Sequence, residues 1–213
     1  MADSSVRTRV EDHWGQTAYR WLAALAIFGA LLSVVLDLVM WRVVDGYDPV
    51  AQTISELAAG PHYWIQDLGI CAFAVGVAAL AVAFTLRSEE VLPVRWLRRA
   101  LALLSAVITV LAIYNEYGDG DVGGFEIHLS LVIAIGLLVP AIFWLSSSLP
   151  YTESRNYRLT LRTVAAAWVI LAPFMFVVPD GWNGAYERGL ASVMVGGVLT
   201  ASTVLLRSEP ETD

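Results

Sequence analysis

The sequence predicts an all-α membrane protein: a polytopic bundle of six transmembrane helices with one short interfacial helix at its outer surface. Two observations predict this class. Of the 213 residues, 57% are hydrophobic and only 15% are charged, whereas a soluble domain is rarely more than about half apolar. The charges also lie in clusters between long apolar runs, which is typical of a chain that crosses a membrane several times.

Six apolar runs account for the spans. At a rise of about 1.5 Å per residue, each run is long enough to cross a hydrocarbon layer of roughly 30 Å, and a helix satisfies its own backbone there. Pro140 and Pro173 fall inside the fourth and fifth runs, where we expect them to kink the helices rather than end them. The runs cover residues 21–41, 64–86, 97–114, 125–145, 161–178 and 189–206.

Arginine predicts the orientation, because cytoplasmic loops are enriched in positive charge. All thirteen basic residues are arginine; Arg42 and Arg188 lie in one set of loops, and the other eleven lie in the opposite set or the terminal tails. We therefore expect a cell-membrane protein with cytoplasmic tails at 1–20 and 207–213, a six-helix domain at 21–206 and no removable signal peptide. Loops 42–63, 115–124 and 179–188 then face outward.

The composition also excludes some chemistry. There is no lysine, so a Schiff base with retinal or pyridoxal phosphate and a phosphate-loop lysine are impossible. Cys71 is the only cysteine, so no disulfide can form within the chain.

The stretch YDPVAQTISELAAGPH, residues 47–62, predicts a short helix over 49–59. Asp48 is a suitable N-cap and Pro49 suits the first helical position. Gly60 suits the left-handed residue beyond a helix end, and Pro61 prevents continuation. We interpret this segment as an interfacial helix with Ser55 and Glu56 directed toward the mouth of the bundle.

Ionisable side chains gather in the outer third of the spans and in the outer loops, whereas the inner halves hold only hydroxyls. Ionisable groups inside a membrane are costly and need a partner or water, so this asymmetry predicts a site open to the outside. The candidate pocket residues are Ser55, Glu56, Asp67, Asn115, Glu126, His128, Glu187 and Arg188.

Arg188 and Glu187 open the sixth span. Glu187 favours the positive end of its helix dipole. Arg188 could neutralise Glu56 or Asp67, or bind a lipid phosphate.

Metal chemistry is an alternative at the same place. His128 with Glu56 and Asp121 would suit zinc, although His128 could equally tie two helices together through a carboxylate. Haem held by His62 and His128, and calcium at the Asp119–Asp121 turn, are further alternatives. We expect no cofactor.

Three segments carry a family resemblance: DPVAQTISELAAG after the first run, the acidic, glycine-rich loop ending in IH, and NGAYERG before the last run. With them the chain resembles the domain-of-unknown-function 998 family from about residue 21 to 206, most specifically in Ser55-Glu56-Leu57. It is more faintly similar to six-helix membrane proteins of the Frag1/DRAM/Sfk1 type. The resemblance implies the topology and no reaction.

We therefore predict an integral membrane protein whose outward polar pocket binds a lipid headgroup or a small amphiphile. A membrane-embedded metal-dependent lipid hydrolase and a structural subunit of a larger complex are the alternatives, so enzymatic activity is left open. The expected partners are membrane lipids and no nucleic acid, with homo- or hetero-oligomers in the membrane left open.

Overall fold

All regular elements are helical in the part of the chain that the computed structural model describes, residues 3–87, 91–114, 124–149 and 155–207. The all-α prediction is therefore confirmed for these residues. The elements are α1 (Asp3–Val43), α2 (Ile54–Ala59), α3 (Tyr63–Arg87), α4 (Leu92–Leu111), α5 (Gly124–Ser146), α6 (Arg155–Leu171), two 3₁₀ turns, η1 (Ala172–Phe176) and η2 (Asp180–Trp182), and α7 (Asn183–Arg207).

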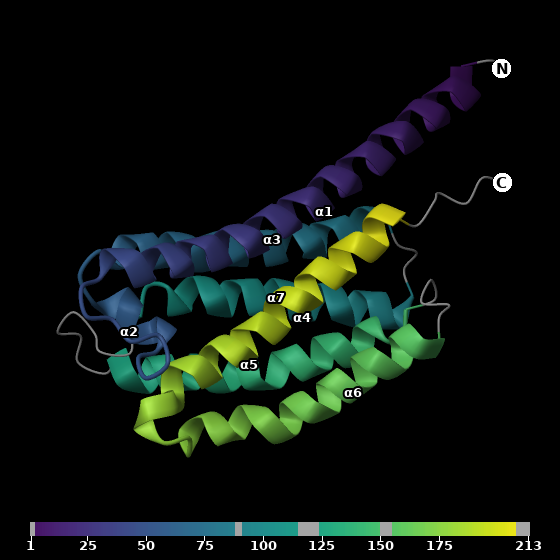
Figure 1. Cartoon of the computed structure of the whole chain (residues 1–213). Coiled ribbons are helices and arrows are strands. Elements are labelled where there is room, and N and C mark those ends of the chain that lie inside the picture. Colours follow the sequence, from purple (N-terminus) through teal and green to yellow (C-terminus); the bar gives the residue numbers. More distant parts are fainter. Residues whose placement is uncertain (1–2, 88–90, 115–123, 150–154, 208–213) are drawn as a thin grey trace.

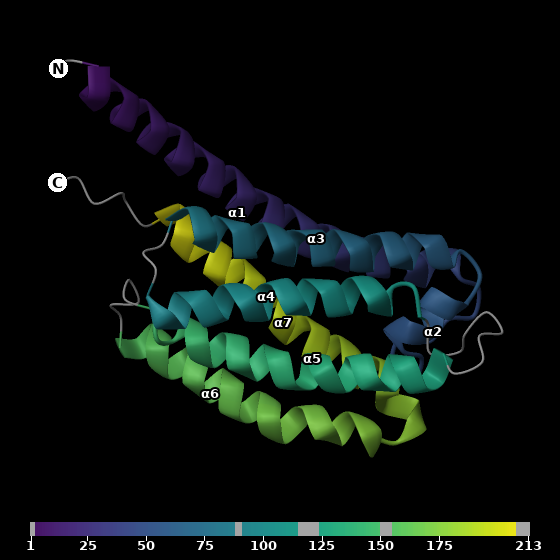
Figure 2. The ribbon, with the colours of Figure 1, turned by 180° about the vertical axis from the view of Figure 1, so that it is seen from behind.

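The long helices pack in chain order. Helix α1 lies along α3, which contacts α4; α4 contacts α5, and α5 contacts α6. Helix α7 crosses diagonally and returns to α1 (Figures 1 and 2). The start of α1 and the end of α7 lie at the same end of the bundle, which we call the terminal end. Helix α2 lies at the opposite end, the α2 end.

Within the described residues, five helical segments are long and apolar enough to cross a membrane: Thr17–Val43, Tyr63–Arg87, Ile127–Ser146, Arg155–Phe176 and Asp180–Arg207.

 The last of these segments, Asp180–Arg207, joins η2 to α7. The protein is thus a multi-pass membrane protein. Helix α4 also packs between two long helices, α3 and α5. It has only 20 residues and carries Arg95, Arg98 and Arg99, and it is not among these five segments.

All six expected spans have somewhat different bounds in the structure, and in two of them a proline explains the difference. The third begins at Leu92, before the expected residue 97, because Pro93 lies in the first turn, where a missing N–H costs nothing. The fifth ends as an α-helix at Leu171, and Pro173 lies in η1. The expectation that Pro173 only kinks this span was therefore wrong, since its ring removes a helical donor and obstructs the preceding turn. Pro140 does lie inside a continuous α5, as expected.

The predicted helix over 49–59 is shorter than expected. Helix α2 begins at Ile54, and residues 49–51 form a turn. Gly60 has an extended backbone (φ −96°), so its predicted left-handed conformation was also wrong. The left-handed residue is His62 (φ 62°), just before α3.

Glycine lets α1 and α3 approach closely. A Cβ on Gly29 would lie 2.3 Å from the Ala72 carbonyl oxygen, and one on Gly76 would lie 3.1 Å from the Ala26 oxygen. Small residues at a membrane helix interface allow this backbone contact, and van der Waals packing then stabilises the pair. The first two long helices therefore form a close-packed unit.

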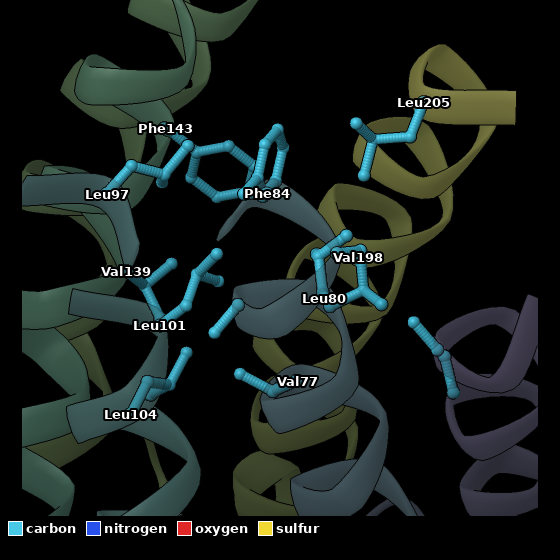
Figure 3. Packing of buried hydrophobic residues seen from close by; sticks show 14 of the residues in the cluster. Val77, Leu80, Phe84, Leu97, Leu101, Leu104, Val139, Phe143, Val198 and Leu205 are labelled. Atoms are coloured by element: carbon cyan, nitrogen blue, oxygen red, sulfur yellow. The ribbon is translucent and has the colours of Figure 1, made fainter. Parts of the chain in front are cut away.

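The interior is filled by aliphatic and aromatic side chains from α1, α3, α4, α5, α6 and α7. Figure 3 shows Leu80 and Phe84 of α3 facing Leu101 of α4, with Phe143 of α5 and Val198 of α7 beside them. All five are buried. Ser105 Oγ inside the bundle donates to the Ala74 oxygen of α3 at 2.8 Å, whereas the buried Ser202 Oγ of α7 has no partner among the described residues. The Ser105 hydroxyl therefore links α4 to α3 without leaving an unpaired donor.

We expect Gly29→Ala to lower the free energy of unfolding by about 1–3 kcal/mol, because the added methyl meets backbone that cannot rotate away. Gly136→Ala is the matched control, since nothing lies within 4 Å of its Cβ position. This change should be neutral or stabilise by up to about 1 kcal/mol. The measurement is the thermal unfolding midpoint in detergent, and equal midpoints for the two variants would contradict the close α1–α3 contact.

Candidate functional site

Helix α2 begins with a reciprocal pair of hydrogen bonds. Thr53 Oγ1 accepts from the Glu56 N–H at 3.1 Å, and Glu56 Oε2 accepts from the Thr53 N–H at 2.6 Å. This capping box satisfies two backbone donors that the helix leaves unpaired. Because one Glu56 carboxylate oxygen is engaged at the start of its own helix, Glu56 has a structural role here.

The turn before α2 is also built by side chains. Asp48 Oδ1 accepts from the Val50 N–H at 2.9 Å, and Gln52 Oε1 accepts from the Asp48 N–H at 2.9 Å. Asp48 thus caps a single turn rather than the longer helix that we expected. The turn leaves the carbonyl groups of Pro49 and Gln52 available to α7.

Arg188 of α7 takes up these carbonyl groups. Its guanidinium donates to both carboxylate oxygens of Asp37 on α1 at 3.0 Å, and to the oxygens of Pro49, Gln52 and Gly184 at 2.9 to 3.2 Å. The side chains of Arg188 and Asp37 are only 13% and 14% exposed. The partner of Arg188 is therefore Asp37, not Glu56 or Asp67 as considered from the sequence.

Two aromatic residues enclose this ion pair. The guanidinium carbon of Arg188 lies 5.3 Å from the Trp41 ring centre and 5.5 Å from that of Tyr47, within the range of cation–π attraction. Trp41 Nε1 also donates to Asp37 at 3.1 Å. Burial raises the pKa of Tyr47 to about 12, so its hydroxyl stays protonated at neutral pH and donates to the Gln52 oxygen while accepting from Arg188.

The first turn of α7 touches the backbone of the loop directly. The N–H groups of Gly184 and Ala185 donate to the oxygens of Ala51 and Val50 at 3.3 and 2.9 Å. A Cβ on Gly184 would lie 2.0 Å from the Gln52 oxygen. Only glycine permits this approach, so Gly184 and Arg188 together fix the loop against α7.

A second set of side chains joins α2, α5 and α7. We call Ser55, His128 and Glu187 the polar triad. Ser55 Oγ donates to Glu187 Oε1 at 3.3 Å and lies 3.2 Å from His128 Nε2. The other Glu187 oxygen accepts from the Ile54 N–H. His128 is buried, whereas Ser55 and Glu187 are half-buried.

The backbone determines the tautomer of His128. Its Nδ1 lies 3.1 Å from the Tyr114 carbonyl oxygen, which can only accept, so Nδ1 carries the proton. In the neutral ring, Nε2 then presents a lone pair to Ser55, so His128 and Glu187 compete for the single proton of the Ser55 hydroxyl. The alternative in which His128 links helices through a carboxylate is confirmed only in the linking. The contacts of His128 are the Ser55 hydroxyl and the Tyr114 carbonyl oxygen, not a carboxylate.

The side-chain oxygen of Gln66, at the α2 end of the bundle, is buried without a hydrogen-bond donor among the described residues. Gln66 is 3% exposed. A buried acceptor without a donor costs about 1–3 kcal/mol. Gln66 was not among the residues expected from the sequence.

An apolar pocket lies further along the bundle, between α3, α4, α5, α6 and α7. Its cavity volume is about 40 Å³, and the wider space of about 510 Å³ that is free of atoms includes open solvent. Phe73, Leu80, Ile142 and Gly197 are among the residues that line it. Hydrocarbon is the chemistry that such walls accommodate.

The remaining predicted residues are placed as follows. Asp67 is half-buried near the start of α3. Asn115 and Asp121 lie outside the described residues, as does the Glu126 side chain, although Glu126 belongs to α5. Within the described part of the chain, no three His, Cys, Asp or Glu side chains group closely enough to hold a metal ion.

Some residues of the site escaped the sequence analysis. Thr53-Ile54-Ser55-Glu56 matches the S/T-x-x-E pattern of a capping box, so this signal was present. The pairing of Asp37 with Arg188 and the carbonyl of Tyr114 had no local signal, because each contact joins segments far apart in the chain.

The bundle and its polar end define a multi-pass α-helical membrane protein. The chain belongs to the family described as protein of unknown function (DUF998), which matches residues 27–204. This confirms the resemblance stated from the sequence, and the matched range includes Asp37, the polar triad and Arg188. Searches among curated proteins and among solved structures gave no match.

We expect Asp37→Asn to lower the free energy of unfolding by about 3–5 kcal/mol, because the buried Arg188 charge loses its counterion. Asp45→Asn, an exposed change between α1 and α2, is the control and should shift stability by less than about 0.5 kcal/mol. Thermal unfolding in detergent measures both. Asp37→Asn as stable as Asp45→Asn would show that the ion pair does not hold the α2 end together.

Proposed function

We propose that this protein binds a neutral amphiphile, whose polar group lies at the polar triad and whose hydrocarbon chain lies in the apolar pocket. One observation carries the proposal: along one face of α3, and along one face of α5, a polar residue near the α2 end is followed by apolar residues further into the bundle. A ligand that satisfies both must itself be polar at one end and apolar along its length.

Helical spacing supports this shared interior. Gln66, Phe73 and Leu80 of α3 are seven residues apart, and so are His128, Ile135 and Ile142 of α5. Seven residues are two turns with a drift of about 20°, so each series lies on one face. The step from Gln66 to Phe73 is about 10 Å, and that from His128 to Ile142 is about 21 Å. These lengths suit an acyl chain.

The charges favour a neutral headgroup. Arg188 has its donors directed at Asp37, Tyr47 and three carbonyl groups, so an anionic phosphate would have to displace these contacts. The polar triad instead offers a hydroxyl, an imidazole and a carboxylate. Hydroxyl and ester groups, as in an acylglycerol, match that set.

The topology belongs to the same proposal. Helix α4 is the sixth span, the terminal end lies in the cytoplasm, and the polar triad faces outward. The position of α4 between α3 and α5 supports its crossing. The distribution of arginine supports the orientation, since Arg95, Arg98 and Arg99 occur in the first half of α4, at the terminal end.

Native mass spectrometry tests ligand binding, with dioleoylglycerol as the probe and dioleoyl phosphatidylglycerol as the anionic comparison. We expect the protein to retain one dioleoylglycerol and Gln66→Leu to retain it about tenfold less, because one hydrogen bond is lost. If the amide has only a structural role, Gln66→Leu should leave retention unchanged. Its unfolding midpoint should stay the same or rise, since the unpaired oxygen is removed.

Gly197→Ala tests the pocket in the same experiment. Its methyl would lie 2.6 Å from the Phe143 ring, and both residues line the pocket, so retention should fall. Gly196→Ala, with nothing within 4 Å of its Cβ position, should retain the lipid fully. Retention that is equal in these two variants and unchanged in Gln66→Leu would refute the proposal.

Reporter fusions test the topology. Alkaline phosphatase, which is active only outside the cytoplasm, should be active when fused after residue 114 and silent after residues 149 and 213. This pattern follows from six spans with cytoplasmic ends. Silence after residue 114 would remove α4 from the spans, and activity after residue 213 would reverse the orientation.

A further inference from the structure

Ser55 and His128 form a contact that α2 does not need for its own stability. The capping box and the Ile54–Glu187 hydrogen bond already fix the start of this helix, and Arg188 fixes the turn before it. Ser55 is half-buried rather than enclosed in the core. The contact therefore calls for another explanation.

We propose that Ser55 is a nucleophile and His128 its general base, and that together they transfer the acyl group of a bound ester lipid to water. The inference rests on the proposed function, because the amphiphile in the pocket is the substrate. The required geometry is a hydroxyl within hydrogen-bond reach of a base whose orientation a third group determines. Here Nε2 lies 3.2 Å from Ser55 Oγ, and the Tyr114 carbonyl holds Nδ1–H.

The first step forms the acyl-enzyme. Ser55 Oγ attacks the ester carbonyl carbon while its proton passes to His128 Nε2. The tetrahedral intermediate then collapses, the ester C–O bond breaks, and the leaving alcohol takes the proton from Nε2. The products of this step are a free alcohol and an acyl group on Ser55, with His128 neutral again.

Water completes the cycle. A water molecule gives a proton to Nε2 as its oxygen attacks the acyl carbonyl carbon. The bond between the acyl carbon and Ser55 Oγ then breaks, and Oγ takes the proton back from Nε2. A fatty acid is released. Glu187 acts as a positioning residue: its carboxylate lies 3.3 Å from Ser55 Oγ and binds the Ile54 N–H, and its negative charge stabilises the transient imidazolium.

The pocket supplies the substrate class. Its walls are apolar, and the faces of α3 and α5 that line it carry Gln66 and His128 nearer the α2 end. A hydrocarbon chain would enter by displacing the side chains that narrow the cavity to about 40 Å³. An ester between a fatty acid and a neutral alcohol therefore meets the nucleophile at its polar end. This makes acylglycerols the expected substrates.

A dodecyl fluorophosphonate tests the nucleophile on the purified full-length protein. Attack by Ser55 Oγ forms an O–P bond and expels fluoride, which leaves a covalent adduct that peptide mass spectrometry locates. We expect the adduct on Ser55, none on that peptide in Ser55→Ala, and an unchanged rate in Ser192→Ala, which removes an exposed serine of α7. Failure to label Ser55 in the protein that retains dioleoylglycerol would overturn the acyl-transfer proposal and leave lipid binding intact.

His128→Gln separates the base from a structural residue. Loss of a general base should slow labelling of Ser55 at least about 100-fold. Dioleoylglycerol retention and the unfolding midpoint are measured on the same variant. If that variant does not fold, His128→Asn takes its place. Undiminished labelling of Ser55 in either folded variant, or labelling of Ser55 in the unchanged protein that is no faster than labelling of the exposed Ser192, would contradict the role of His128.

Discussion

The ion pair between Asp37 and Arg188 is the contact on which the α2 end of this protein depends. It joins the first and last long helices, and the same guanidinium holds the turn that leads into α2. An isolated charge in or near a membrane is expensive, so each partner makes the other tolerable. The planar guanidinium suits this position because it can serve a carboxylate and several carbonyl groups at once.

The position of α2 follows from that anchor. A helix of six residues is too short to be stable alone, and tertiary contacts must hold it. Gly184 allows the loop backbone to touch α7, and Glu187, one residue before Arg188, accepts from the first N–H of α2. The consecutive residues Glu187 and Arg188 thus orient α2, and this orientation brings Ser55 to His128.

Polar and apolar chemistry are separated along the bundle. Charges and hydrogen-bonding side chains concentrate at the α2 end, whereas a core to which all six long helices contribute fills the middle. The hydroxyls of Thr85, Ser105, Thr109 and Thr200 within the helices donate to backbone carbonyl groups, so they cost little in a membrane. An amphiphile fits such a gradient better than an ion or a soluble polar molecule, which would find no continuous polar route through the described part of the bundle.

The sequence by itself determined the all-α class, most of the helices and the family, because long apolar runs permit only helices in a lipid layer. It also identified Ser55, His128, Glu187 and Arg188 as neighbours at one end, since polar groups inside a membrane must gather. Helix ends were less accurate: the capping box at Thr53 overrode Asp48-Pro49 as the start of α2, and Pro173 ended a helix that apolar composition alone would continue.

Only the tertiary structure decided which polar groups pair. Arg188 could have met Glu56 or Asp67 by composition, but the packing of α1 against α7 puts Asp37 in its reach. The tautomer of His128 depends on the Tyr114 carbonyl. Every residue has a backbone carbonyl, so the sequence does not indicate which one His128 contacts. Such pairings depend on the packing of helices far apart in the chain, and local residue patterns carry no record of it.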